Sequence, residues 1–149
     1  MFHPWRALRE MSHVVVEWIR PHPRAPGATN GADAIWLDPR MSQVERRCVL
    51  AHELVHIEYE HRGCQPPAVE REVRTEAARR LVQMQHLVPA AQWALSLEEL
   101  ADELWVTPMV LRDRLSGLTD GERQELAEAA GWVVPDGDRL GDSGPFSAP

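Results

Sequence analysis

The sequence predicts an α+β fold in which a small N-terminal antiparallel sheet or hairpin packs on a bundle of helices. A short region of β-branched and aromatic residues comes first, and helix-capping patterns recur through the rest of the chain. The 149 residues are 44% hydrophobic and 26% charged, as is typical of one folded domain. We therefore expect a single domain over residues 1–134. A tail rich in Gly, Pro, Asp and Ser, residues 135–149, should be disordered.

Two short strands are expected near the N-terminus. Residues 12–19 read SHVVVEWI and residues 34–37 read AIWL, and both segments are rich in residues that favour strands. The segment between them is rich in Pro, Gly and Asn and predicts a loop. The two strands should pair as a hairpin with a long loop, joined by a further short strand near the N-terminus.

Five helices are expected after the strands. Ser42 and Glu45 form a capping box that opens a helix to about residue 60. Apolar residues at helical spacing predict a second helix over about 68–86. Capping residues at Ser96, Thr107 and Thr119 open three more, which end near residues 104, 116 and 130.

The helices of residues 96–130 have a helix-turn-helix rhythm, but direct nucleic-acid binding is not expected. The formal net charge is −7, and the second helix offers only Arg112 and Arg114, which Asp113 interrupts. These helices should instead complete the core. Three tryptophans in or next to this part of the chain are expected to be packing residues: Trp93, Trp105 and Trp132.

The cysteine content, the N-terminal pattern and the length of the apolar runs indicate the cellular compartment. Two cysteines, Cys48 and Cys64, do not make a disulfide framework, which favours a reducing cytoplasm. The N-terminus shows no signal-peptide pattern, and no apolar run approaches the roughly 18 residues of a membrane span. We expect a cytoplasmic protein with no membrane partner.

The segment His52-Glu53-Leu54-Val55-His56 is an HExxH motif within a predicted helix. Residues four apart lie on one helix face, so both imidazoles can bind one Zn²⁺ ion. Glu53 lies about 100° around the helix, beside the metal, where it can act as general base towards a water molecule. The sequence therefore predicts a catalytic zinc site with His52 and His56 as ligands.

A catalytic zinc ion usually takes a third protein ligand. The metzincin pattern is excluded, because Tyr59 and Arg62 stand where that class has a glycine and a histidine. His61 would face away from the two histidines if the helix continued, so we expect it to be exposed or satisfied elsewhere. The better candidates are carboxylates of the following helix: Glu70, Glu72 and Glu76.

Two segments around the motif carry a resemblance to a known family. CVLAHELVHIEYEH (48–61) followed by EREVRTEAARRLV (70–82) resembles the ImmA/IrrE family of metallopeptidases, in the short form common in actinobacteria and their phages. The N-terminal HPWRALREM and the later LADELWV and LRDRLSGLT fit the same pattern. The resemblance covers about residues 3–128, and the combination is much more specific than HExxH alone.

The resemblance implies a gluzincin-like zinc site, which is HExxH plus a downstream glutamate. Laying the family's downstream run on residues 77–82 puts this ligand at Glu72; departures from the run keep Glu76 as the alternative. The implied activity is a zinc-dependent endopeptidase that cleaves a repressor-type regulator, with Glu53 as the catalytic base. By analogy with zincins, the strand of residues 34–37 would hold the extended substrate as an edge strand.

A second hypothesis is a non-catalytic, zinc-containing interaction module that binds a repressor or DNA through the C-terminal helices. Its zinc site would be closed by a fourth protein ligand. The presence of Glu53 and the lack of an obvious fourth ligand in the sequence favour the peptidase.

Overall fold

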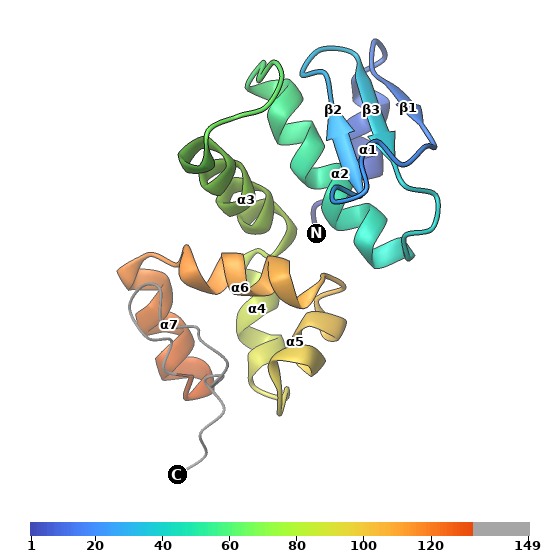
Figure 1. Cartoon of the computed structure of the whole chain (residues 1–149). Coiled ribbons are helices and arrows are strands. Elements are labelled where there is room, and N and C mark those ends of the chain that lie inside the picture. The colour runs from blue at the N-terminus through green and yellow to red at the C-terminus, as the bar shows by residue number, and fades with distance from the viewer. Residues whose placement is uncertain (133–149) are drawn as a thin grey trace. The chain divides into compact units, whose positions relative to one another are not determined.

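The computed structural model describes residues 1–132, and the predicted disordered tail (135–149) lies outside the described residues. In this part of the chain, a three-stranded sheet and seven helices confirm the α+β class (Figure 1). The chain divides into two compact units, one of residues 2–77 and one that begins at residue 78 and includes Met1, and each is described by itself. The elements are α1 (Pro4–Glu10), β1 (Val15–Glu17), β2 (Gly27–Thr29), β3 (Ala34–Leu37), α2 (Gln43–Glu58), α3 (Pro67–Leu81), α4 (Met84–Ala91), α5 (Leu97–Glu103), α6 (Pro108–Ser116) and α7 (Asp120–Ala130).

The sheet of the N-terminal unit has the strand order β1-β3-β2, with β3 in the centre. β1 runs parallel to β3, with Val16 opposite Ile35, and β2 runs antiparallel to it, with Ala28 opposite Trp36. Ile35 and Leu37 point to the same face of β3 and are fully buried.

The predicted hairpin between the first and the last of these strands is wrong. The segment expected to be only a loop contributes β2, so β1 and β3 pair in parallel, and the N-terminal segment forms helix α1 in place of a strand. The reason is the length of the connection, since residues 18–33 leave room for a strand that returns beside β3.

An apolar core joins the sheet, α1 and α2 of the N-terminal unit. Ile35 and Leu37 of the sheet pack with Leu50 and Leu54 of α2, and α1 adds Leu8 at the margin of the cluster. The buried faces of α1 and α2 therefore cover the same side of the sheet, and α2 is fixed against it.

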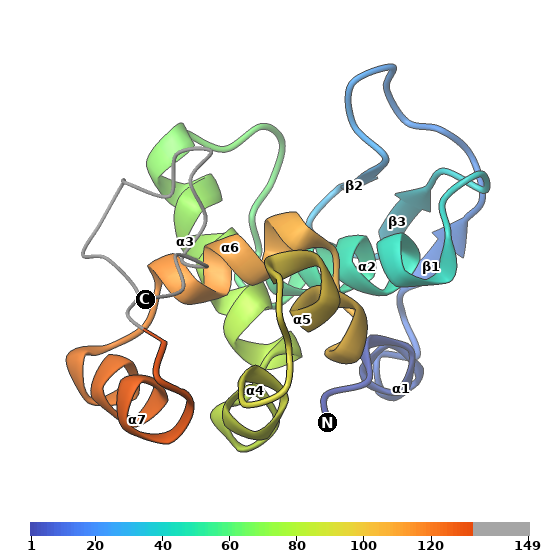
Figure 2. The same ribbon diagram turned by 90° about the horizontal axis from the view of Figure 1, so that it is seen from below.

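The C-terminal unit is helical. Within it, α4 packs against α7 and α5, and α5 packs against α6 (Figure 2). The predicted helix starts are confirmed, because the side chains of Ser96, Thr107 and Thr119 each accept a hydrogen bond from a backbone N–H of the first turn. The α5–α6 pair has the expected helix-turn-helix order.

The expected helix of residues 68–86 is broken into α3 and α4, and this break contains a buried arginine contact. Arg114 of α6 is 2% exposed, and its Nε donates to the carbonyl oxygen of Val82 at 2.8 Å. Its guanidinium also pairs with Glu122 of α7 at 2.5 Å. The carbonyl at the helix end is satisfied by a residue 32 positions away, which a local sequence pattern does not reveal.

Two of the tryptophans differ from expectation. Trp93 is 83% exposed and Trp105 is 42% exposed. Trp93 lies in the turn after α4, beyond the helix face on which Leu87 and Ala91 are buried, so its assignment as a packing residue is wrong. Residues 1–132 contain no helix that combines the length and apolar character of a membrane span.

Candidate metal centre

Helix α2 presents the two histidines of the motif on one face. The predicted capping box opens the helix, with Ser42 accepting from the backbone of Glu45 and the Glu45 carboxylate accepting from the backbone of Ser42. His52 and His56 follow one turn apart, and their Nε2 atoms lie 3.1 Å from each other. The HExxH segment therefore folds as the sequence predicts.

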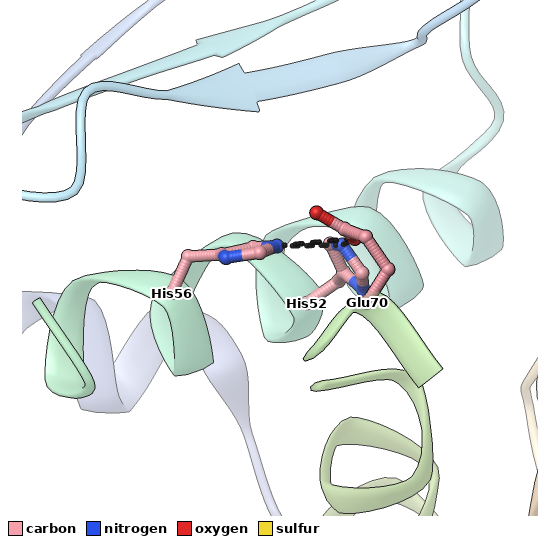
Figure 3. A group of neighbouring side chains, drawn as sticks. All are labelled: His52, His56 and Glu70. Atoms are coloured by element: carbon pink, nitrogen blue, oxygen red, sulfur yellow. Dashed lines mark hydrogen bonds and ion pairs between the residues drawn. The ribbon is translucent and has the colours of Figure 1, made fainter. Parts of the chain in front are cut away.

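Glu70 in the first turn of α3 completes a group of three. Its Oε2 atom lies 3.5 Å from the Nε2 atom of His52 and 3.5 Å from that of His56 (Figure 3). Helix α3 is fixed against α2 because Val73 packs with Val55 in a buried cluster. Glu70 lies three residues before Val73, on the same side of α3, and so reaches the histidines.

The three atoms suit a metal ion. Ligands of a tetrahedral zinc ion at about 2.0–2.1 Å are separated by roughly 3.3 Å from one another. The observed separations of 3.1, 3.5 and 3.5 Å agree with this. A triangle with such sides has a point roughly 2 Å from all three corners. His52, His56 and Glu70 could therefore hold a metal ion.

Burial favours the neutral form of both imidazoles. Burial lowers the pKa of His52 to about 4, with smaller contributions from His56 and Arg74. Burial also lowers the pKa of His56, although the carboxylate of Glu70 acts in the opposite direction. A neutral imidazole has a free electron pair on one nitrogen, which metal binding requires.

Glu53 is buried directly beside this group. Its side chain is 6% exposed, and burial, followed by the negative charge of Glu70, raises its pKa to about 8. Strand β2 covers it closely: a Cβ atom at Gly27 would lie 3.3 Å from Glu53 Oε1 and would overlap Cγ1 of Val49. Glycine at this position lets β2 approach α2, whereas the local sequence predicts only a loop residue here.

The third member of the group differs from the residue that the resemblance indicated. Glu72 is exposed, and neither Glu72 nor Glu76 belongs to the potential metal group found in the described residues. Successive helical residues are rotated by about 100°, so Glu72 and Glu76 project from α3 in other directions than Glu70. The choice of Glu72, with Glu76 as the alternative, stays a prediction to be compared with Glu70 by experiment.

The strand expected to hold a substrate is also different. Residues 34–37 form β3, which is paired on both sides and therefore has no free edge. β2 is an edge strand, and it packs against the metal helix. Figure 3 shows β2 as the light-blue strand that passes across the site. The assignment of residues 34–37 as the edge strand is wrong.

Together, the fold and this site define a metallopeptidase-like domain. The model of the peptidase M78 family, described as the IrrE N-terminal-like domain, matches residues 20–116. The chain belongs to this family, which confirms the resemblance to ImmA/IrrE proteins. Comparisons with the curated proteins and with the solved structures found no match.

Proposed function

We propose that the protein is a zinc-dependent endopeptidase of the cytoplasm that cleaves a specific protein, a repressor-type regulator. The observation that carries the proposal is the triangle of His52, His56 and Glu70, with the buried Glu53 beside it. Two imidazoles and one carboxylate favour zinc among divalent ions, and three protein ligands leave a position open for chemistry. Glu72 and Glu76 remain in the proposal as competing third ligands.

The step of peptide hydrolysis that the chain's own residues would carry out is a proton transfer. When bound, zinc would supply the positive charge that lowers the pKa of a water molecule to about 7 and polarises the scissile carbonyl. With the positive charge of a metal ion beside it, Glu53 would be ionised, and it takes a proton from the attacking water as the new C–O bond forms. It then donates this proton to the amide nitrogen as the C–N bond breaks, which releases an amine. Burial beneath β2 keeps Glu53 out of bulk water and holds it next to the ligands.

An extended peptide is the substrate shape that β2 favours. Asp38 N–H donates to the carbonyl of Pro26, and Asn30 N–H donates to the carbonyl of Ala34, so alternate residues of β2 face β3. The backbone groups of Gly27 and Thr29, which lie between these positions, are directed to the other side. A peptide added along this edge would pass next to Glu53.

The alternative of a non-catalytic module receives less support. A structural zinc site takes four protein ligands, whereas the group found in residues 1–132 has three. On α6, Arg114 is buried in pairing with Glu122 and so is withdrawn from any contact with DNA.

The test compares wild type with Glu53→Gln on a proteome-derived peptide library and on folded repressor-type regulators. Zinc is supplied, and new termini are identified by mass spectrometry. We expect wild type to cleave a restricted set of sites and Glu53→Gln to retain its metal while cleaving at least about 100-fold more slowly. Equal cleavage by the variant, or no cleavage by zinc-loaded wild type of any substrate offered, would contradict the proposal.

A further inference from the structure

The end of the metal helix returns the chain over its second histidine. Glu60 has a left-handed backbone, with φ of 54°. Its N–H donates to the carbonyl of Ile57 at 3.0 Å, and the N–H of His61 donates to the carbonyl of His56 at 2.9 Å. These two bonds make a Schellman motif, in which the residue at the His61 position comes to lie against the residue at the His56 position.

The side chains of this pair meet through their ring nitrogens. Nδ1 of His61 lies 3.1 Å from Nδ1 of His56, and the two rings meet edge to face with centroids 5.2 Å apart. The other nitrogen of His56, Nε2, is the one that faces Glu70 and His52. His56 therefore has each of its two nitrogens committed to a different partner.

The backbone of His61 also lies against the turn between β2 and β3. Gly31, in the turn between β2 and β3, has φ of +71°, and a Cβ atom there would overlap the carbonyl oxygen of His61. The turn itself is closed by Asn30, whose Oδ1 accepts from the N–H groups of Ala32 and Asp33. His61 is thus packed between the helix end and a hydrogen-bonded turn.

We propose that His61 is a positioning residue of the metal centre, which acts by fixing the tautomer of His56. A bond between two neutral imidazoles needs one donor and one acceptor. When Nε2 of His56 binds a metal, its proton must be on Nδ1, and Nδ1 of His61 is the acceptor that faces it. The partner on the far nitrogen of a ligand histidine orients the ring and strengthens the ligand. This role rests on the proposed metal centre and goes beyond it, because HExxH and the downstream glutamate do not include His61.

The test measures zinc affinity by competition with a chromophoric chelator, with Zn²⁺ as the only added ion. The variants are His61→Leu, which removes the acceptor, and His61→Asn, which keeps a short side chain with an acceptor oxygen. The half-buried His86 of the C-terminal unit, which like His61 is of intermediate burial, gives a matched control, His86→Leu. We expect the dissociation constant to rise about 10- to 100-fold in His61→Leu, to recover most of this in His61→Asn, and to stay unchanged in His86→Leu.

A ring-nitrogen NMR spectrum of the zinc-loaded wild type gives a second reading. It should show the proton of His56 on Nδ1 and that of His61 on Nε2. Zinc affinity equal to wild type in His61→Leu, or an equal loss in the Leu and Asn variants, would overturn the positioning role while leaving the proposed metal centre intact. Failure of the wild type to bind zinc would instead refute the metal centre, and the positioning role with it.

Discussion

The metal-free protein should lose stability as the pH rises, because Glu53 is buried as a carboxylic acid. Burial and the charge of Glu70 raise its pKa from 4.5 to about 8. Between these values the folded state keeps a proton on Glu53 that the unfolded state has released. The folded state then binds more protons, so the free energy of unfolding falls with rising pH and levels off above about pH 8.

The size of this loss is clearest above pH 6.5. Below pH 6.5 the titration of His52 makes the free energy of unfolding rise with pH, which opposes the effect of Glu53. The pKa of His52 is lowered from 6.5 to about 4, so between these values only the unfolded state binds its proton. His56, whose pKa is also lowered, acts in the same direction as His52. Above pH 6.5 both histidines lose their remaining protons in the unfolded state, and Glu53 becomes the dominant group. One unit of pKa difference corresponds to about 1.36 kcal/mol, and Glu53 itself begins to ionise in the folded state near pH 8, so the free energy of unfolding should fall by about 1 kcal/mol from pH 6.5 to 8.

The assay is urea unfolding with a chelator present, followed by tryptophan fluorescence at steps from pH 6.5 to 8.5. Glu53→Gln cannot ionise and should remove the slope, whereas Glu72→Gln, a change at an exposed carboxylate, should keep it. A flat profile in wild type, or the same slope in Glu53→Gln, would refute the assignment of a buried protonated Glu53.

Three further substitutions test the local geometry through the free energy of unfolding. Glu60→Gly should be about 1 kcal/mol more stable than Glu60→Ala, because only glycine adopts the left-handed backbone at this helix end without cost; a more stable alanine variant would refute this. Gly27→Ala should cost about 1–3 kcal/mol through overlap with Val49, and adding Val49→Ala should recover part of it; no recovery would mean that the overlap is not the cause. Arg114→Met should cost about 3 kcal/mol because it removes the arginine partner of Glu122 and of the Val82 carbonyl. The control Arg112→Met, at an exposed position, should cost less than about 0.5 kcal/mol. Equal costs for the two variants would contradict the buried network.

Helix starts were predictable because capping is local. Ser42 and Thr119 each bond to a glutamate three residues on, so four consecutive residues carry the whole signal. Strand pairing was not predictable in the same way. The two strands that pair with β3 are β1 and β2, which are separated from each other by residues 18–26. The importance of Gly27 is recognisable only once Val49 is known to lie against it.

In the candidate site too, the local part was predictable from the sequence and the part that depends on tertiary packing was not. His52, Glu53 and His56 share one helix, so their spacing predicted their arrangement. Glu70 was one of three candidate carboxylates, but which of these meets the histidines depends on how α3 packs against Val55. His61 was set aside on the premise of a continuing helix, and the left-handed Glu60 that ends α2 is neither of the residue types, Gly or Asn, that usually mark such an end.

The most direct test of the central claim is the metal content of the purified, zinc-supplied protein by elemental mass spectrometry. Wild type is compared with Glu70→Ala, Glu72→Ala and Glu76→Ala. We expect roughly one zinc ion per chain in wild type, its loss in Glu70→Ala, and its retention in the other two variants. A metal-free wild type would contradict the metal centre, and loss in Glu72→Ala or Glu76→Ala with retention in Glu70→Ala would assign the third ligand to that residue instead.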